Sequence, residues 1–310
     1  MAIQTQAKMI PVVDFSNKEL KPGSSSWSST RRDVCRALEE YGCFVAEVGN
    51  KVPLKLHNTT FGAIRELFDF PTEAKKKLTS KRPGHGYLFK ARYERMAIEN
   101  GNSPEETQKL TNIFWPNGNV HFSESADSYV KLMEELDQMV MRMVFENYGV
   151  EKYYDSLTES VTRTLGFIKY KEAQITTSTC NALERHTDKT FTTILHQNQV
   201  KGLEIKIKDD KWLGFDYSPS SFIFLAADAL QVWSNDRIPS CIHRVQISEN
   251  ETRTRYSFGL FTFYDKTISV PEELVDEEHP LRYKPLNIFE YLKANVGHGG
   301  ELSIKAYCGI

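Results

Sequence analysis

The residues of this chain that could do chemistry lie mostly between positions 183 and 257. His186 and Asp188 are two positions apart, and side chains at that spacing point to the same face of a β-strand. His243 follows in a second segment of strand-like composition. Two imidazoles and one carboxylate form the donor set of non-haem Fe(II) sites that keep open coordination positions. We therefore predict an iron site here, although each residue alone is more typical of a structural side chain.

Arg255 and Ser257 have the same alternating spacing in the next apolar segment after His243. An arginine that points into a β core is costly unless it meets an anion, and its planar fork suits a carboxylate. The pair predicts an anchor for the distal carboxylate of 2-oxoglutarate, whose 2-oxo acid end would chelate the iron. The alternative for Arg255 is a surface charge beside Arg253.

With these motifs, the chain resembles the plant 2-oxoglutarate- and Fe(II)-dependent dioxygenases over nearly its whole length. The matching segments are Ile10-Pro-Val-Val-Asp14, Tyr41-Gly-Cys-Phe44, His186-Thr-Asp188, Gly202-Leu-Glu204, Trp233-Ser-Asn235, His243-Arg-Val245 and Arg255-Tyr-Ser257. Three stretches, at 186–189, 235–239 and 305–310, look most like one branch. It contains the AOP-like, alkenyl-producing dioxygenases of glucosinolate metabolism and steroidal-alkaloid hydroxylases.

The resemblance implies a role for each matching residue. His186, Asp188 and His243 would be the iron ligands, and Arg255 and Ser257 would bind 2-oxoglutarate. Where the family often has Asn-x-Tyr, this chain has Ile168 and Tyr170, so only Tyr170 is expected to contact the co-substrate. Phe261 corresponds to a position that lines the substrate pocket in relatives, with plain core packing as the alternative.

The reaction implied by the family uses Fe(II), 2-oxoglutarate and O2, with ascorbate in support, and releases succinate and CO2. We expect hydroxylation of a small, largely apolar plant metabolite, with aromatic residues in 87–115 and Phe191, Phe261 and Phe263 as pocket walls. The carboxylate of Asp188 leaves no site for halide, so we predict no chlorination.

Several alternatives stay open. Desaturation, demethylation or ring closure would use the same machinery. An oxidase that inactivates an auxin or gibberellin hormone would need a pocket cation, for which Lys90, Arg92 and Arg95 are candidates. A catalytically silent metabolite-binding protein would be free to lose the triad or the arginine. A zinc hydrolase would give Arg255 and Ser257 no role.

Composition limits the other possibilities. The 310 residues are 40% hydrophobic and 26% charged, with a formal net charge of −2 and a pI of about 6.5. This near-neutral balance gives no electrostatic reason to expect nucleic acid or an anionic membrane as a partner. The five cysteines have no CxxC spacing and suggest free thiols, and the first residues lack a signal-peptide core. We expect a cytoplasmic monomer.

The elements that must position these residues divide the chain in two. Helical periodicity over 30–41, 54–68 and 125–148 predicts a mostly helical N-terminal layer over 1–160, with residues 79–119 as aromatic-rich loop. The segments with strand composition are 165–170, 190–195, 202–207, 211–215, 222–226, 231–233, 242–247 and 256–264. They predict a jelly-roll core over 161–266. A C-terminal segment, 267–310, would add a helix at 286–294, giving one α+β domain.

Overall fold

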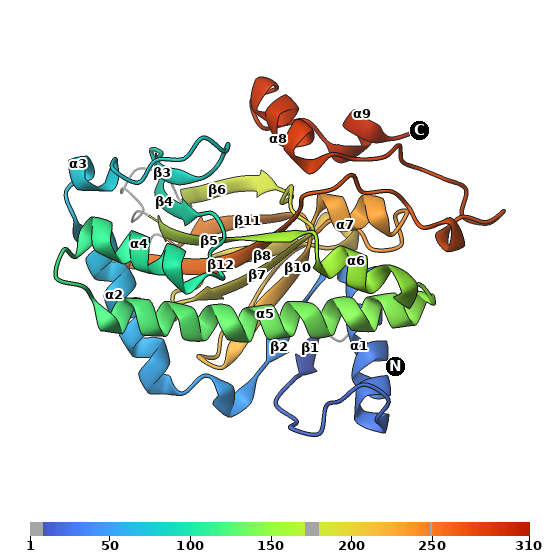
Figure 1. Ribbon diagram of the computed structural model, residues 1–310, viewed down its shortest axis with the longest axis horizontal. Helices are drawn as coiled ribbons and strands as arrows, with labels where there is room; N and C mark the ends of the chain where they lie inside the picture. Colours follow the sequence, from blue (N-terminus) through green and yellow to red (C-terminus); the bar gives the residue numbers. More distant parts are fainter. Residues whose placement is uncertain (1–8, 171–179, 249) are drawn as a thin grey trace, which may run out of the picture.

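The computed structural model describes residues 9–170, 180–248 and 250–310, and Figure 1 shows how its elements are arranged. Its helices are α1 (Ser25–Tyr41), α2 (Leu54–Asp69), α3 (Thr72–Lys75), α4 (Pro104–Phe114), α5 (Val120–Tyr148), α6 (Tyr154–Thr158), α7 (Asp228–Trp233), α8 (Ile288–Gly297) and α9 (Ile304–Cys308). Among these described helices, none has the length and apolarity needed to cross a bilayer.

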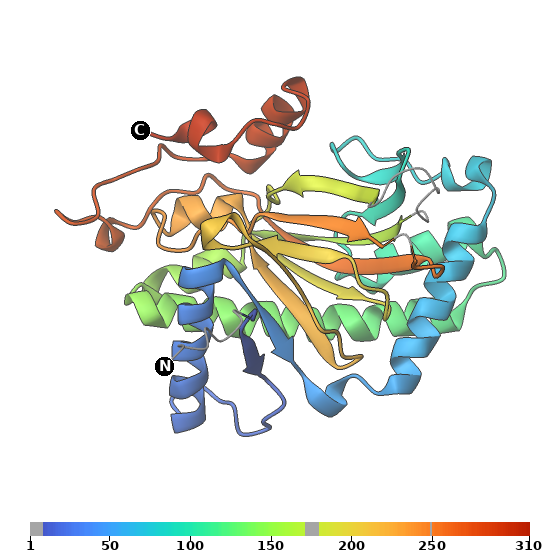
Figure 2. The same ribbon diagram turned by 180° about the vertical axis from the view of Figure 1, so that it is seen from behind.

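The strands form two sheets that face each other (Figures 1 and 2). The major sheet has the order β1-β2-β10-β7-β12-β5-β4-β3 and the minor sheet the order β6-β11-β8-β9. Their bounds are β1 (Val12–Asp14), β2 (Cys43–Glu47), β3 (Gly86–Phe89), β4 (Tyr93–Ile98), β5 (Val161–Tyr170), β6 (Cys180–His186), β7 (Thr192–Gln197), β8 (Leu203–Lys206), β9 (Trp212–Gly214), β10 (Ser221–Ala226), β11 (His243–Ile247) and β12 (Arg255–Tyr264). Apart from the parallel β1–β2 pair, the recorded pairings are antiparallel. This arrangement confirms the predicted α+β fold with a double-stranded β-helix core.

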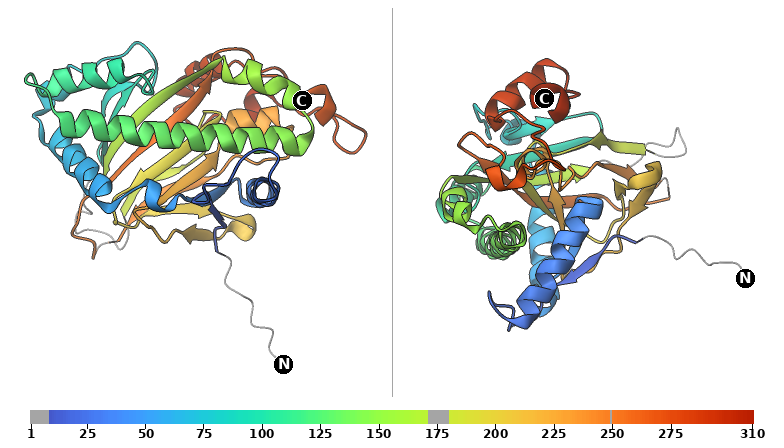
Figure 3. Two further views of the ribbon diagram at one scale, coloured as in Figure 1. Left: turned by 60° about the horizontal axis from the view of Figure 1, so that its bottom comes forward. Right: turned by 90° about the vertical axis from the view of Figure 1, so that its right-hand side faces the viewer.

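Helices α1, α2, α4 and α5 cover the outer face of the major sheet, and α5 runs along the sheet with α1 and α2 beside it (Figures 1 and 3). The Asn119 side chain caps the start of α5 by accepting from the Phe122 amide at 3.0 Å, and Gly149 ends it with φ 68°. The methionines of α5 that face the sheet, such as Met133 and Met143, are fully buried. They belong to the core, as the sequence pattern indicates.

The inner face of the major sheet carries the residues that matter for function. Side chains directly opposite each other in antiparallel strands share a face, so the pairing partners of β12 identify this side. Arg255 lies opposite Tyr170, Ser257 opposite Ile168, and Phe261 opposite Thr164. The minor sheet closes over this face, and the two enclose a separate apolar cluster that includes Tyr170, Ile205 and Val245.

Residues 79–119 differ from the prediction of loop. They contain the β3–β4 hairpin, which joins the edge of the major sheet through β5, and helix α4. Glycines and prolines hid these elements, but each has a local use. Gly86 starts β3 with φ 78°, and Pro104 sits at the first position of α4, where no amide donor is needed.

The segment 231–233 was also predicted wrongly, because it belongs to helix α7 and not to a strand. All six residues of α7 are buried, so the helix has no exposed polar face and the sequence shows no helical period. Asn235 and Asp236 follow it with φ 53° and 68°, a conformation that Asn and Asp tolerate better than most residues.

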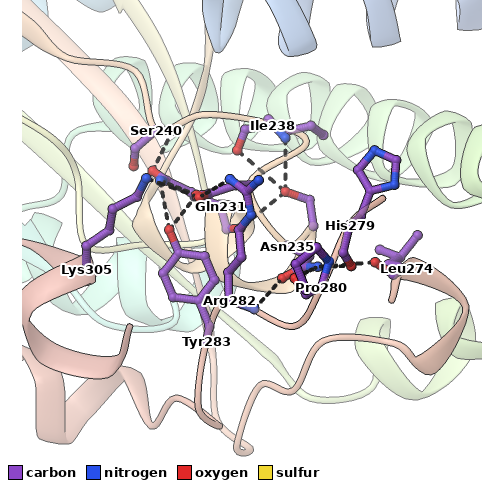
Figure 4. A network of polar contacts seen from close by, with 12 residues as sticks. Gln231, Asn235, Ile238, Ser240, Leu274, His279, Pro280, Arg282, Tyr283 and Lys305 are labelled. Carbon is purple, nitrogen blue, oxygen red and sulfur yellow. Dashed lines mark hydrogen bonds and ion pairs between the residues drawn. The ribbon is translucent and has the colours of Figure 1, made fainter. Parts of the chain in front are cut away.

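The turn after α7 fastens the C-terminal segment to the core (Figure 4). Asp236 accepts from Gln231 at 2.7 Å and from the Tyr283 hydroxyl, and it forms ion pairs with Arg282 at 3.2 Å and Lys305 at 3.1 Å. Helices α8 and α9 thereby lie on the far side of the sheets from α1 (Figures 1 and 3). Two of the branch-like stretches of the sequence, 235–239 and 305–310, therefore meet in one network.

The cysteine side chains that the structure describes are free and buried, namely those of Cys35, Cys43, Cys241 and Cys308. This agrees with the prediction of free thiols for these four residues. The side chain of Cys180 lies outside the described part of the chain, as do residues 1–8.

Candidate metal and co-substrate site

Three side chains meet where the minor sheet ends. His186 is the last residue of β6, and it pairs with His243, the first residue of β11. Their Nε2 atoms lie 3.6 Å and 4.0 Å from Oδ1 of Asp188, and the two rings are 4.2 Å apart. One ligand atom from each residue falls within 4.8 Å of the others. The three residues named by the sequence are thus brought together.

Asp188 reaches this position by a route different from the one predicted. The strand β6 ends at His186, so Asp188 does not share a strand face with it. The chain after the strand is held by its backbone, because the Asp188 carbonyl accepts from the amide of Asp228 at 2.9 Å. Asp228 in turn forms an ion pair with Lys189 at 2.9 Å and accepts from Tyr291 of α8 at 2.9 Å.

Hydrogen bonds orient all three potential ligands. The Nδ1 atoms of His186 and His243 lie 2.9 Å and 3.1 Å from the carbonyl oxygens of Glu184 and Cys241. A carbonyl can only accept, so each Nδ1 carries the proton and each Nε2 presents its lone pair to the centre. Thr193 of β7 donates to Oδ2 of Asp188 at 2.7 Å, which leaves Oδ1 directed to the histidines. Such outer contacts are typical of built metal sites.

The pKa shifts of the three residues favour protonation states that can bind a cation. Burial opposes ionisation of Asp188, but His186 and His243 outweigh it and hold the pKa of Asp188 well below its usual range. Burial, followed by the neighbouring His186, lowers the pKa of His243 to about 4. Burial would also lower the pKa of His186, but the Asp188 carboxylate raises it overall. At neutral pH the site therefore holds an ionised carboxylate and a neutral His243.

Arg255 lies deeper between the sheets and is 1% exposed. Its Nη2 donates to Gln197, and its guanidinium lies 4.5 Å above the ring of Tyr170. Its Nε and Nη1 are buried and have no hydrogen-bond partner in the described residues. A buried cation with unused donors is costly unless a ligand supplies the missing anion. The surface-charge alternative for Arg255 is therefore wrong.

The glycine at position 202 leaves room for the side chain of Arg255. A Cβ at Gly202 would lie 3.2 Å from Cδ of Arg255 and 3.0 Å from the carbonyl oxygen of Gln246, so only glycine fits there without a shift. The Tyr217 hydroxyl is buried nearby; burial raises its pKa, and the charge of Arg255 partly offsets the rise. Ser257, 2% exposed, is two residues further along the inner face. Nothing in the sequence pointed to Tyr217 or Gln197.

Of the aromatic residues proposed as pocket walls, only some face the inside. Phe261 lies on the inner face of β12, in the row of Thr193 and Thr164. Phe263, two residues on, stacks on Phe289 of α8 at 6.0 Å. The others belong elsewhere: Phe191 packs on Trp233 in the helical core, Phe114 and Trp115 pack around Phe70, and Phe89 is 54% exposed. For these four the pocket expectation was wrong, because Phe191, Phe114 and Trp115 pack against other parts of the core and Phe89 faces solvent.

Comparisons with known proteins agree with this geometry. Residues 148–263 match the model of the 2OG-Fe(II) oxygenase superfamily, and residues 10–117 match that of the N-terminal region of the non-haem dioxygenases in morphine synthesis. The probable 2-oxoglutarate-dependent dioxygenase AOP1.2 of Arabidopsis thaliana is 40% identical over 291 residues, covering 91% of this chain and 89% of the relative. The chain belongs to the 2OG-Fe(II) oxygenase superfamily. The predicted likeness to the AOP dioxygenases is confirmed by the same match.

Solved structures of superfamily members have the same fold. The rice dioxygenase for auxin oxidation superposes with a TM-score of 0.80 at 26% identity, covering 97% of this chain and 100% of that one. Its Arabidopsis thaliana counterpart in complex with 2-oxoglutarate has a TM-score of 0.76 at 27% identity, covering 88% and 100%. This chain is thus similar to dioxygenases along almost its whole length.

The residues present fit the two groups that the superfamily uses. Two imidazole nitrogens and a carboxylate suit Fe(II) and leave other coordination positions for small molecules. The unused donors of Arg255 suit one carboxylate of 2-oxoglutarate, and Ser257 and Tyr170 lie beside that position. His186, Asp188 and His243 could therefore hold the metal while Arg255 holds the far end of the co-substrate.

Proposed function

We propose that this enzyme hydroxylates a small, largely apolar plant metabolite, with succinate and CO2 as co-products. The proposal rests on one observation: the two facing sheets bring together a converged two-histidine, one-carboxylate set and a buried arginine that has two donors unused within the described residues. In this proposal Fe(II) is held by His186, Asp188 and His243. 2-Oxoglutarate is bound by Arg255, Ser257 and Tyr170. A zinc hydrolase would leave the arginine without a role.

The chain's own contribution is orientation and shelter. The Glu184 and Cys241 carbonyls keep the two Nδ1 protons in place, and Thr193 keeps one oxygen of Asp188 free for the metal. Arg255 fixes the direction of the co-substrate through its charge. Bound together, iron, 2-oxoglutarate and O2 supply the oxidising power. Positioning of the substrate against this centre, with water excluded, decides which bond is oxidised.

An apolar substrate is supported by the side chains on the inner face near the triad. Ile168 occupies the position where the family often has asparagine, and Leu195 and Phe261 lie on the same side of the sheet. Together they line the inner face with hydrocarbon and aromatic surface. Such a surface suits a ring or an aliphatic skeleton.

The test measures succinate release and oxidised product. The protein is loaded anaerobically with Fe(II), ascorbate and 2-oxoglutarate, and then given O2 and a plant small-molecule extract. We expect extract-dependent succinate and a product 16 mass units heavier than its precursor, the mass of one added oxygen. His186→Ala should abolish both, whereas His121→Ala, which alters an exposed histidine on α5, should abolish neither. Full turnover by His186→Ala, or equal turnover with Zn²⁺, would refute the proposal.

A further inference from the structure

A second arginine reaches the inner face of the major sheet. Arg95 of β4 lies opposite Ile168 of β5, which in turn lies opposite Ser257 of β12. Arg95 therefore points to the same side as the co-substrate residues. The other two cations considered in this stretch, Lys90 and Arg92, are exposed in the β3–β4 turn. Of the three candidates, only Arg95 is directed between the sheets.

Arg95 has no counter-ion in the described part of the chain. Its Nε is buried without a hydrogen-bond partner, and no carboxylate oxygen among the described residues lies within 4.0 Å of its nitrogens. Burial lowers the pKa of Arg95, and the more distant negative charge of Asp188 partly opposes this shift. The guanidinium therefore lies in the electrostatic field of the candidate metal site without touching its carboxylate.

Two fully buried cations of this fold, Lys75 and Arg163, are neutralised by nearby acids, and Arg95 is partly buried with its Nε enclosed. Lys75 forms an ion pair with Glu94 at 2.6 Å, and Arg163 with Glu134 at 3.0 Å and Asp137 at 3.4 Å. A buried charge without such a partner destabilises the protein, so it usually serves a ligand. Arg255 has unused donors in the same way, and a co-substrate is available to occupy them. For Arg95, neither an acid of the described residues nor the co-substrate accounts for the charge.

An apolar wall adjoins Arg95. Its Cζ lies 5.3 Å from the centre of the Phe261 ring. A Cβ on Gly166, between the two, would come within 3.0 Å of the Phe261 ring and 3.8 Å of Arg95 Nε. Glycine at this position thus lets the cation and the aromatic ring pack side by side, because a Cβ there would crowd the ring. A cation next to a ring suits a ligand with an acidic group attached to an apolar body.

We propose that Arg95 anchors a carboxylate of the substrate, so that the enzyme acts on an apolar carboxylic acid. This inference rests on the proposed function and specifies its substrate class. The acid group pairs with the planar fork of Arg95, and the apolar part lies along Phe261 towards the metal. It favours the acid-oxidising alternative over a neutral metabolite.

The first experiment tests retention of ligands and needs no turnover. Protein loaded anaerobically with Mn(II) and 2-oxoglutarate is mixed with a plant extract, filtered, and the retained small molecules are identified by mass spectrometry. We expect carboxylic acids to be retained, to be lost when the extract is esterified beforehand, and to bind Arg95→Gln about 10 to 100 times more weakly. Arg95→Lys should fall between, because lysine keeps the charge but not the fork. Arg92→Gln, with its side chain exposed, is the matched control.

Three results would overturn the inference: retention of neutral compounds only, retention of no acid, or equal retention of acids by Arg95→Gln. Kinetics with a retained acid supply a second criterion. Arg95→Gln should raise the KM for the acid at least tenfold and change the KM for 2-oxoglutarate less than twofold. A rise in the KM for 2-oxoglutarate alone would assign Arg95 to the co-substrate and contradict the proposal.

Stability separates a binding role from a structural one. Because Arg95 has no counter-ion among the described residues, its replacement by methionine should leave the melting temperature of the ligand-free protein unchanged or raise it. A large loss would show that Arg95 supports the fold. Arg95-dependent retention of acids without succinate release would reject the proposed oxygenase function but not this site. Succinate release driven by neutral compounds alone would support the oxygenase function and reject the proposed role of Arg95.

Discussion

Thr193→Val removes one hydrogen bond to Asp188 and a second one from Thr190, with little change in the shape of the side chain. Thr193 is fully buried, and its hydroxyl donates to Oδ2 of Asp188 at 2.7 Å. Because the hydroxyl proton of Thr193 is used in this bond, the Thr190 hydroxyl, 3.0 Å away, must donate to the Thr193 oxygen. Valine has nearly the same shape but cannot take part in this chain. Asp188 would then lose the contact that keeps its Oδ1 directed to the histidines.

The size of the effect follows from the charge on the acceptor. A hydrogen bond to an ionised group contributes about 1.5–3 kcal/mol, and about 1.4 kcal/mol corresponds to a tenfold change in an equilibrium constant. We therefore expect Thr193→Val to weaken metal binding by about 10- to 100-fold. This range agrees with the usual effect of losing an outer contact to a metal ligand. The loss of kcat at saturating iron should be smaller than the loss of affinity, because the ligands themselves remain.

Anaerobic titration with Mn(II), a redox-stable stand-in for Fe(II), measures the affinity directly, and the metal-induced rise in melting temperature gives a second reading. Thr111→Val is the matched control, because Thr111 is also fully buried but donates to a backbone carbonyl of α4 at 2.8 Å. The control should bind metal like the unmodified protein. If folded Thr193→Val did so within twofold, the assigned role of this hydroxyl would be wrong.

Three further predictions concern stability and selectivity. Lys75→Met should lower the free energy of unfolding by about 3–5 kcal/mol in urea titrations, because Glu94 stays buried without its 2.6 Å partner, and Glu94→Gln added to it should recover part of the loss. Burial, followed by the charge of His57, lowers the pKa of His196 to about 3, and burial lowers that of His57. Below a pH of about 6.5 the unfolded chain therefore binds protons that the native protein does not, so the free energy of unfolding falls as the pH drops. His57→Gln should reduce the dependence of this free energy on pH by up to about 1.4 kcal/mol per pH unit. An unchanged pH dependence would contradict the prediction. Turnover in the presence of chloride should give no chlorinated product by mass spectrometry, since the Asp188 carboxylate occupies the metal position that a halide would need. Detection of a chlorinated product would refute this prediction.

The sequence predicted residues that come together but not the route by which one of them arrives. His186 and His243 were found because strands with recognisable composition carry them. Asp188 was placed on the same strand, whereas a backbone bond to Asp228 draws it in from a loop. A long-range contact of this kind leaves no local pattern in the sequence. The identities of the three side chains were nevertheless enough to suggest the metal.

The β3–β4 hairpin shows a different limit. Its glycines and prolines were taken as signs of loop, so nothing distinguished Arg95 from the other two candidate pocket cations, Lys90 and Arg92. Pairing with β5 made this segment a strand, and the register turned Arg95 inward. Register depends on a partner far away in the chain, which single-sequence patterns do not show. A charge next to aromatic residues in a Gly-rich stretch was the only signal available.

The two sheets divide the work in a way that bears on specificity. The histidines come from the minor sheet, and Asp188 from the loop after it, whereas Arg95 and Phe261 belong to the major sheet. Substitutions on β4 can therefore alter what is bound without moving the metal ligands. Thr193 is where the two functions meet, because it lies in the same row as Phe261 and holds Asp188. A bulky change at Phe261 that shifts β7 should thus reduce metal affinity as well as selectivity, whereas Arg95→Gln should reduce selectivity and leave metal affinity intact.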